Sequence, residues 1–382
     1  MIQFLRSALC VELREPSHLK FALEDFALPS MTALVLLACL LACGGGGVVT
    51  SSPSNPSSTP TLGQAAAHHN IRVGAAADSP YLSDSNYSAT LGSEFSQLQA
   101  ENEMKFSIIH PLSNAYDFGG GDALTSFAQA HSMGVRGHTL VWHNQVPTWV
   151  TNGNYNSMQL ATILQDHITT VMAHYAGTIY AWDVVNEAFN LDGSMRSTIW
   201  YDQPGIGFAF MGTKYIEQTL TWAHAADANA LLFYNDYGAE TMNAKSDAIY
   251  AMAQDFKNRN VPLDGIGFQL HIDLSFDDPN TLASLASNMQ RFAALGLIVH
   301  ITELDIRLSD SSAASFNAQA KLYGEIAAIC VQQPACKLFQ TWGFTDKYSW
   351  IPSFFPGQGW ALLWDANYQK KPAYGSVLNA LQ

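Results

Sequence analysis

Short apolar segments alternate with helical stretches along most of the chain, and this alternation limits the possible folds more than any other feature. Helices are predicted at residues 157–175, 214–226, 244–258 and 281–295. The segments with the length and apolar content of buried strands are residues 71–77, 97–101, 134–143, 180–187, 230–237, 265–273, 297–305 and 337–342. A strand–helix unit repeated about eight times over ~300 residues is typical of a (β/α)8 barrel.

A doubly wound sheet is the alternative that the same alternation allows. Such a sheet normally carries a glycine-rich phosphate turn after its first strand. The segment Gly74-Ala75-Ala76-Ala77-Asp78 has no such turn. Gly134, Gly177 and Gly296 lie where helices pass into strands, as helix-terminating glycines do. We therefore expect one α/β barrel domain over residues 64–382.

The residues before this domain have the features of an export signal and a tether. An apolar run at residues 33–42 is too short to cross a bilayer, which takes about 20 residues, and fits the apolar part of a signal peptide. The following Cys43 completes Leu40-Leu41-Ala42-Cys43, which resembles a bacterial lipobox whose cysteine is acylated. No basic residue lies between Met31 and the apolar run, so a plain secretory signal and a different translation start are the alternatives. We predict a signal segment at residues 1–43 and a Gly/Ser/Pro linker at residues 44–63.

The charge balance is acidic and bears on the kind of partner. The 382 residues include 18 Lys and Arg against 32 Asp and Glu, a formal net charge of −14. This argues against nucleic acid or an anionic membrane surface as partner and permits a neutral ligand. Nine tryptophans fit either sugar stacking or ordinary core packing. We expect the protein to be exported and then either secreted or anchored by a lipid at a bacterial cell surface or in the periplasm. We also expect a neutral substrate and a monomeric protein.

Two predicted strands end in a glutamate at a position where burial makes a charge unfavourable. The segment Trp182-Asp183-Val184-Val185-Asn186-Glu187 has this design, and so does the segment that runs from Leu297 to Glu303 and Asp305. Each glutamate alone is equally compatible with a helix cap or a salt bridge. Together they fit a carboxyl pair that divides acid/base and nucleophilic work, as retaining glycosidases require.

Most of the other predicted strands also end in polar or aromatic residues. In a barrel the strand tips surround one pocket, so these side chains are expected to converge. Packing alone does not account for amide, imidazole, carboxylate and indole groups at most tips. The polar and aromatic residues at these strand ends include Glu101, Asn102, Lys105, His138, Trp142, Gln145, Tyr237, Gln269, His271, Trp342 and Trp350.

Four ordered motifs resemble the signatures of glycoside hydrolase family 10, whose members are chiefly endo-β-1,4-xylanases. The resemblance covers residues 64–382 and implies a (β/α)8 barrel and retention of anomeric configuration. The motifs are Gly137-His138-Thr139-Leu140-Val141-Trp142-His143, Trp182-Asp183-Val184-Val185-Asn186-Glu187, Ile301-Thr302-Glu303-Leu304-Asp305 and Thr341-Trp342-Gly343-Phe344-Thr345-Asp346.

The resemblance also implies roles for individual residues. Glu187 resembles the general acid/base of the family and Glu303 its nucleophile. Asn186 would bond the sugar 2-hydroxyl, and His271, held by Asp305, would bond the nucleophile. The positions that resemble substrate-binding residues are Glu101, Asn102, Lys105, His138, Trp142, Gln145, Tyr237, Gln269, Trp342 and Trp350.

In the family, the indoles at the positions of Trp342 and Trp350 crowd the space that a hydroxymethyl group needs, which favours xylose over glucose. The expected partners are therefore xylan and xylo-oligosaccharides. A β-1,4-glucanase, or an enzyme of mixed xylanase and cellobiohydrolase activity, is the nearest alternative. A surface-tethered sugar-binding protein without catalysis is the alternative from another class.

Three further expectations come from the residues themselves. The sequence has no Gly-x-Ser-x-Gly, P-loop or Gly-x-Gly-x-x-Gly motif, and the pair His68-His69 lacks metal-ligand spacing, so we predict neither a cofactor nor a catalytic metal. Cys330 and Cys336 are close enough to form a small disulfide loop in an exported protein, with two free thiols as the alternative. The run at residues 119–121, three glycines, predicts a loop.

Overall fold

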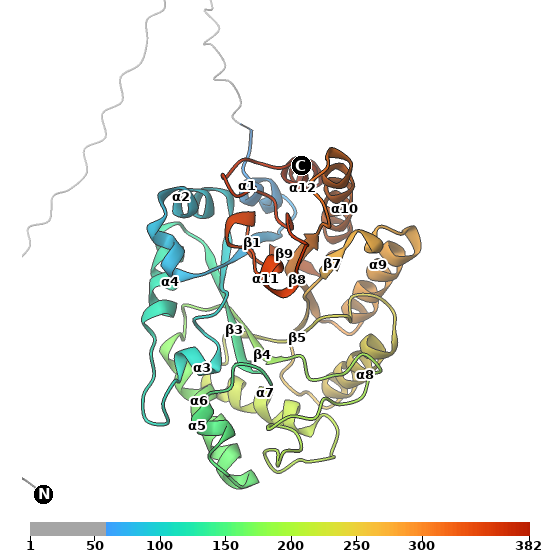
Figure 1. Ribbon diagram of the computed structural model, residues 1–382. Helices are drawn as coiled ribbons and strands as arrows, with labels where there is room; N and C mark the ends of the chain where they lie inside the picture. Colours follow the sequence, from blue (N-terminus) through green and yellow to red (C-terminus); the bar gives the residue numbers. More distant parts are fainter. Residues whose placement is uncertain (1–58) are drawn as a thin grey trace, which may run out of the picture. The chain divides into compact units, whose positions relative to one another are not determined.

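Eight parallel strands form a closed barrel in the computed structural model, which describes residues 59–382. The strands pair in the ring β1–β2–β3–β4–β5–β6–β8–β9, and β9 returns to β1. Figure 1 shows the strands at the centre with the helices around them, which confirms the (β/α)8 barrel. The strands are β1 (Arg72–Ala77), β2 (Gln97–Ala100), β3 (Gly134–Val141), β4 (Ala181–Asn186), β5 (Leu231–Asp236), β6 (Gly265–Phe268), β7 (His271–Asp273), β8 (Ile298–Arg307) and β9 (Cys336–Thr341).

Most of the helices lie between successive strands, and several begin at residues whose side chains cap them. Asn156 and Asn243 form capping boxes in front of α6 and α8, and Asp278 caps α9. Among residues 59–382, none of the helices has both the length and the apolar character of a bilayer-crossing segment. The helices are α1 (Leu62–Ala67), α2 (Ser85–Glu94), α3 (Phe106–Ile109), α4 (Gly119–Ala130), α5 (Thr148–Thr151), α6 (Ser157–His174), α7 (Lys214–Ala226), α8 (Ala244–Asn258), α9 (Pro279–Ala294), α10 (Ala313–Gln332), α11 (Ile351–Phe354) and α12 (Pro372–Leu381).

The N-terminal boundary of the barrel domain lies slightly ahead of the position expected from the sequence. Helix α1 begins at Leu62, and the side chain of Thr61 caps it, whereas the sequence predicts a domain start at residue 64. The predicted signal segment, Cys43 and most of the predicted linker lie outside the described residues.

The predicted strand at residues 265–273 is divided into β6 and β7. Leu270 breaks it because its φ is +61°, a left-handed conformation that a strand cannot contain. The backbone N–H of Leu270 donates to Glu240 Oε1 at 3.0 Å, which anchors the break. After it, β7 pairs only with the outer part of β8, so His271 lies opposite Asp305.

The expectation of a loop at the three glycines of residues 119–121 is wrong, because these residues form the first turn of α4. The side chain of Asp117 accepts a hydrogen bond from the N–H of Gly119 at 3.0 Å and so satisfies one free amide of this turn. A Cβ at Gly121 would lie 2.1 Å from the hydroxyl of Tyr175. Close packing against that ring, rather than loop flexibility, explains the glycine.

The barrel interior contains hydrogen-bonded polar side chains as well as apolar ones. The guanidinium of Arg136 donates to both carboxylate oxygens of Asp183 and, at 2.9 Å, to Nδ1 of His300, and all three side chains are buried. Burial and the adjacent Arg136 charge hold the pKa of His300 well below its ordinary value, so the neutral ring can accept this bond. A second group of buried hydrogen bonds joins the side chain of Gln340 to those of Gln97 and Gln99. These pairings satisfy groups whose burial without partners would be unfavourable.

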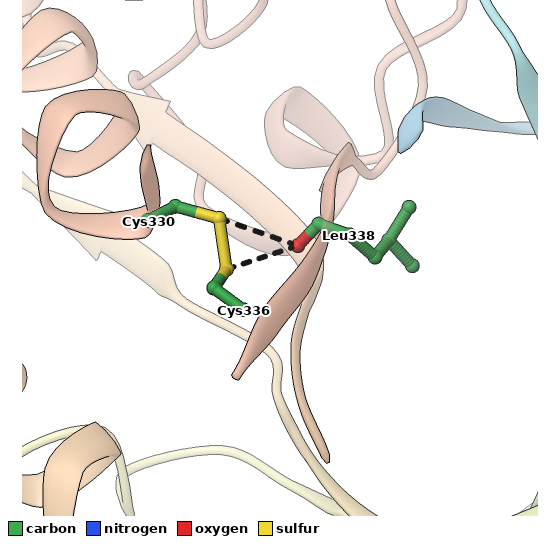
Figure 2. The surroundings of a disulfide bond; sticks show 3 residues. All are labelled: Cys330, Cys336 and Leu338. Carbon is green, nitrogen blue, oxygen red and sulfur yellow. Dashed lines mark hydrogen bonds between the residues drawn. A yellow bond between two sulfur atoms is a disulfide. The ribbon is translucent and has the colours of Figure 1, made fainter. Parts of the chain in front are cut away.

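A disulfide bond joins Cys330, in the last turn of α10, to Cys336, the first residue of β9 (Figure 2). The two sulfur atoms lie 3.9 and 3.6 Å from the carbonyl oxygen of Leu338. The disulfide spans the short connection between α10 and β9, and β9 is the strand that pairs with β1 and closes the barrel.

We predict a modest stabilisation by this disulfide. Closing so short a loop removes unfolded-chain entropy worth about 2 kcal/mol, which corresponds to a Tm difference of about 3–5 °C. The double substitution Cys330→Ala/Cys336→Ala should therefore lower Tm by this amount in a thermal unfolding scan. Dithiothreitol should lower Tm of the parent protein and leave that of the double variant unchanged. Equal Tm values for the two oxidised proteins would contradict the prediction.

Candidate active site

The two strand-end glutamates lie at the same end of the barrel. Glu187 directly follows β4, and Glu303 lies within β8. The φ of Glu187 is +58°, which for a residue with a side chain costs about 1 kcal/mol or more. Two hydrogen bonds hold this conformation: the N–H of Glu187 donates to the carbonyl of Asn235 at 3.0 Å, and Arg196 Nε donates to the carbonyl of Glu187 at 2.9 Å. The surrounding structure therefore imposes the direction of the Glu187 side chain.

Asn235, at the end of β5, connects the two glutamates. Its Nδ2 donates to Glu303 Oε1 at 2.7 Å and to Asn186 Oδ1 at 2.9 Å. Asn186 Nδ2 in turn donates to Glu187 Oε1 at 3.3 Å. The hydroxyl of Thr302 donates to Asn235 Oδ1 at 2.7 Å, which fixes the orientation of the buried amide. One chain of side-chain hydrogen bonds thus runs from Glu187 to Glu303.

Gln269 adds a second support on the side of Glu187. Its Nε2 lies 3.1 Å from Glu187 Oε1 and 3.2 Å from Asn186 Oδ1. It directly precedes Leu270, the residue at which the strand breaks. The break therefore places Gln269 toward Glu187 and His271 toward β8.

His271 holds Glu303 from the other side. Its Nε2 lies 3.0 Å from Glu303 Oε2, and its Nδ1 lies 2.8 Å from Asp305 Oδ2. Trp350 Nε1 donates to the same Asp305 oxygen at 2.8 Å. Asp305 therefore orients the imidazole and does not itself face the open cavity.

The charges of this group follow from its contacts. Burial alone would lower the pKa of His271, but Asp305 and Glu303 outweigh burial and raise this pKa to about 10. Burial would raise the pKa of Glu303, but the hydrogen bond from His271 and the nearby positive charge lower it below its ordinary value. Glu303 is therefore an ionised carboxylate at neutral pH, paired with an imidazolium.

A cavity of about 520 Å³ lies above these groups and collects most of the predicted site residues. Its walls combine three indoles with carboxylates, amides and imidazoles, the composition expected for a sugar site. The predicted residues that line it are Lys105, His138, Trp142, Asn186, Glu187, Tyr237, Gln269, His271, Glu303, Trp342 and Trp350.

Four predicted residues are not part of the cavity wall. Asp305 lies behind His271, and Asn102 lies behind Lys105, whose Nζ is 3.3 Å from Asn102 Oδ1. Burial beside other carboxylates raises the pKa of Glu101. Gln145 has a positive φ of 49° in the loop after β3, and its carbonyl accepts a hydrogen bond from a backbone amide of α3. Its exposed side chain does not face the cavity.

Neighbouring cationic side chains hold the aromatic walls of the cavity in place. The ring of Tyr237 lies 4.0 Å from Nζ of the buried Lys245, and its hydroxyl accepts a hydrogen bond from Arg196 at 3.0 Å. Nζ of Lys105 lies 5.1 and 5.4 Å from the ring centroids of Trp142 and Trp342. These contacts restrain the indole and phenol rings before any ligand is present.

Three buried polar atoms of wall residues have no hydrogen-bond partner among residues 59–382. They are Trp142 Nε1, His143 Nδ1 and Arg307 Nε. His143 Nδ1 lies 4.0 Å from Glu187 Oε2, and burial lowers the pKa of this histidine. Such atoms beside a cavity can bond to water or to a polar ligand.

The structure adds residues that the sequence analysis did not select. Asn235 lies within the predicted strand at residues 230–237 and is assigned no role from the sequence, because a lone buried asparagine gives no sign of the two groups that it bridges. Arg307 is the last residue of β8 and lies beyond the strand predicted at residues 297–305, so the strand-end criterion did not include it. No strand position predicts the aromatic wall contributed by α11 and the residue after it. The added wall residues are His143, Asn144, Arg307, Phe354 and Phe355.

No group of three or more His, Cys, Asp or Glu side chains in residues 59–382 has the arrangement of a metal site. The chemistry available to this cavity is that of an ionised carboxylate and a second carboxyl group, both held by amides. Such a pair can attack an electrophilic carbon and transfer a proton to the departing oxygen.

Comparison with known proteins gives matches over nearly all of the described residues. The model of "Glycosyl hydrolase family 10" matches residues 61–380. Endo-1,4-beta-xylanase B of Thermotoga neapolitana is 42% identical over 321 residues, which cover 82% of this chain and 89% of that protein. Endo-1,4-beta-xylanase C of Phanerodontia chrysosporium is 39% identical over 329 residues, which cover 85% and 79%.

The fold has equally similar solved relatives. The crystal structure of xylanase 10B from Thermotoga petrophila RKU-1 in complex with xylobiose superposes with a TM-score of 0.81 at 42% identity, covering 86% of this chain and 98% of that one. The native xylanase 10B from Thermotoga maritima has a TM-score of 0.79 at 43% identity, with coverages of 84% and 98%. The family match, these identities and the shared barrel show that the chain belongs to glycosyl hydrolase family 10.

Proposed function

We propose that the protein is an endo-1,4-β-xylanase that hydrolyses internal xylosidic bonds of xylan by double displacement. Glu303 is the nucleophile and Glu187 the general acid/base. The observation that carries this proposal is the difference between their environments. Glu303 is bonded to an imidazolium and to Asn235, whereas Glu187 is bonded only to the neutral amides of Asn186 and Gln269.

In the first step, a carboxylate oxygen of Glu303 attacks the anomeric carbon while the bond from that carbon to the leaving oxygen breaks. Glu187, in its protonated form, gives its proton to the leaving oxygen. Retaining enzymes need the two carboxyl groups roughly 5–5.5 Å apart for this division of work. His271 and Asn235 keep Glu303 ionised and directed at the carbon.

In the second step, the ionised Glu187 removes a proton from water, whose oxygen attacks the anomeric carbon of the glycosyl ester. The bond to Glu303 breaks, and Glu303 leaves as a carboxylate. Formation of the ester neutralises Glu303, so Glu187 acts as a base beside an uncharged ester. Asn186 bonds the 2-hydroxyl of the sugar, a contact that strengthens in the transition state.

The substrate class follows from the walls of the cavity and from the relatives. Trp342 and Trp350 flank His271 with ring-centroid distances of 6.2 and 5.0 Å, so bulky indoles stand beside the reacting position. Such walls favour a pentose without a hydroxymethyl group. The Thermotoga petrophila relative binds xylobiose. A β-1,4-glucanase with the same carboxyl pair is the competing proposal.

The signal segment and Cys43 support a proposal about location. We propose that the chain is exported and that either cleavage of the signal or acylation of Cys43 follows. Acylation would tether the barrel domain to a membrane through the linker. At the membrane surface the protein can act on polymeric substrate as a monomer.

The first test is incubation of the purified protein with linear xylan and, separately, with carboxymethylcellulose. Release of a series of short xylo-oligosaccharides from xylan, with little product from carboxymethylcellulose, is expected because internal bonds of a pentose polymer are cleaved. Size-resolved chromatography of the products measures both substrate class and endo action. Equal release from both polymers would favour the glucanase or the mixed enzyme, and no release from either would favour the non-catalytic binding protein.

The substitution Glu303→Ala should reduce kcat on xylan by at least about 10⁴-fold, because no group remains to form the ester. Xylo-oligosaccharide binding should persist, since the cavity walls are intact. Azide added with an aryl β-xylobioside should restore turnover and give the α-glycosyl azide, because azide enters from the side of the missing carboxylate. Glu325→Ala, a change at an exposed carboxylate on α10, is the matched control. Activity near that of the parent would contradict the role of Glu303.

The substitution His271→Asn should move the acidic limb of the pH profile of kcat/KM upward by about one pH unit. The imidazolium lowers the pKa of Glu303, so without it Glu303 becomes protonated, and inactive as nucleophile, at a higher pH. His174→Asn is the control, because His174 pairs with Asp122 on the outer surface. The midpoint of the limb, and not the plateau rate, is the measurement. An unchanged midpoint would contradict the proposed electrostatic role.

A further inference from the structure

We propose that a groove on the outside of the barrel, between α3, α5 and α6, is a second binding site for the same neutral polysaccharide that the catalytic cavity cleaves. The choice of polysaccharide rests on the proposed function. The groove has a volume of about 800 Å³, against about 520 Å³ for the catalytic cavity, and the two share no lining residue.

Aromatic rings form one side of the groove and are fixed by their own contacts. The rings of His110 and Tyr116 are stacked at 3.9 Å between centroids, and the indole of Trp149 lies 4.8 Å from that of His110. Trp149 Nε1 donates to the carbonyl of His110 at 3.1 Å. Tyr155 extends this side and packs on Gly153, where a Cβ would lie 2.1 Å from its ring. Rigid rings at a surface are suited to stacking on the apolar faces of sugar rings.

The opposite side is a polar face of α6 whose side chains are almost all neutral. Gln159, Thr162, Asp166 and Thr170 follow one another at helical spacing and line the groove. Asp166 is the only charged residue of the lining, and no Lys or Arg belongs to it among the described residues. A phosphate or an acidic polymer would meet no positive charge here. Hydroxyl groups of a neutral sugar would meet amide and hydroxyl partners.

A buried polar group within the lining points to a ligand independently of the rings. The side chain of His110 is nearly fully buried, and neither ring nitrogen makes a hydrogen bond of good geometry in residues 59–382, although the backbone of Ser113 lies close enough to raise the pKa of the ring. Burial lowers the pKa of His110, so the ring is neutral and offers one donor and one acceptor. A buried polar group without a partner is unfavourable, and a sugar hydroxyl can supply the missing bond.

The groove is joined to the catalytic cavity through the loops that follow β2 and β3. Lys105 lines the cavity and Phe106 directly begins α3, which leads to the groove. The N–H of Ser107 donates to the carbonyl of Gln145 at 2.8 Å and ties the two loops together. A chain held in the groove therefore stays close to the cavity and raises the local concentration of cleavable bonds.

Two substitutions test this site without touching the catalytic residues. Tyr155→Ala removes a stacking ring, and Thr162→Trp fills the groove from the exposed face of α6. Phe210→Ala removes an aromatic side chain that is 80% exposed and lies outside both sites, and it serves as the control. Each protein is assayed as the full chain on insoluble xylan and on xylotetraose, which is too short to occupy both sites at once.

Tyr155→Ala should raise KM on insoluble xylan about fivefold, since a stacked ring covers on the order of 40 Å² of apolar sugar surface. Thr162→Trp should raise KM at least as much, because the added indole occupies the space of the bound chain. Their kcat/KM on xylotetraose should equal that of the parent. For Phe210→Ala, KM on insoluble xylan and kcat/KM on xylotetraose should both equal those of the parent. An unchanged KM on xylan would overturn the proposal. A parallel loss on xylotetraose would overturn it too, because the change would then act through the cavity.

Binding without turnover separates this proposal from the proposed function. In the Glu303→Ala background, retardation of the protein by soluble xylan in native gel electrophoresis should weaken when Tyr155→Ala or Thr162→Trp is added. This result would support the groove even if the parent hydrolysed no xylan. Retardation that is insensitive to both groove substitutions would overturn the second site while leaving the proposed catalysis intact.

Discussion

The geometry of the active site depends on one buried amide, that of Asn235. Its single NH₂ group donates to Glu303 on one side and to Asn186 on the other, and its oxygen is held by Thr302. The two donor hydrogens of an amide have a fixed angle, so the partners on β4 and β8 can satisfy both only in one relative position. Because Asn235 is fully buried, a partner lost on either side would leave a polar group unpaired, at a cost of about 1–3 kcal/mol. The barrel is thereby held in the arrangement that the chemistry needs.

The polar groups inside the barrel extend this constraint below the active site. Asp183 accepts hydrogen bonds from Arg136 and, at 3.0 Å, from Nδ1 of His138, whose ring reaches the cavity wall. A hydrogen-bonded interior specifies the register between strands more narrowly than apolar packing does, since each bond has a required direction. Fold and site are therefore parts of one network. The aromatic groove between α3, α5 and α6 uses different elements and is built by ring stacking.

Sequence reasoning located the parts of the site that depend on strand ends. The (β/α)8 barrel, Glu187, Glu303 and His271 were all accessible because a parallel barrel brings the carboxyl ends of its strands to one mouth. It failed where backbone conformation or close packing decides. The sequence predicts a continuous strand across the break at Leu270 and a loop at the glycines that begin α4. The bridging role of Asn235 and the ring contributed by Phe354 had no local pattern at all.

The sequence by itself determined the number and order of strand–helix units and the residue types at their ends, because apolar periodicity and helix caps are local properties of the chain. Only the tertiary structure decided how those ends meet. Glu187 and Leu270 adopt positive φ values through hydrogen bonds to Asn235 and Glu240, which come from other strands and loops. The pKa of Glu303 is likewise set by burial, His271, His138 and Asn235, and that of His271 by burial, Asp305 and Glu303. Short-range preferences cannot encode such effects, since they arise between residues that are far apart in the chain until the barrel closes.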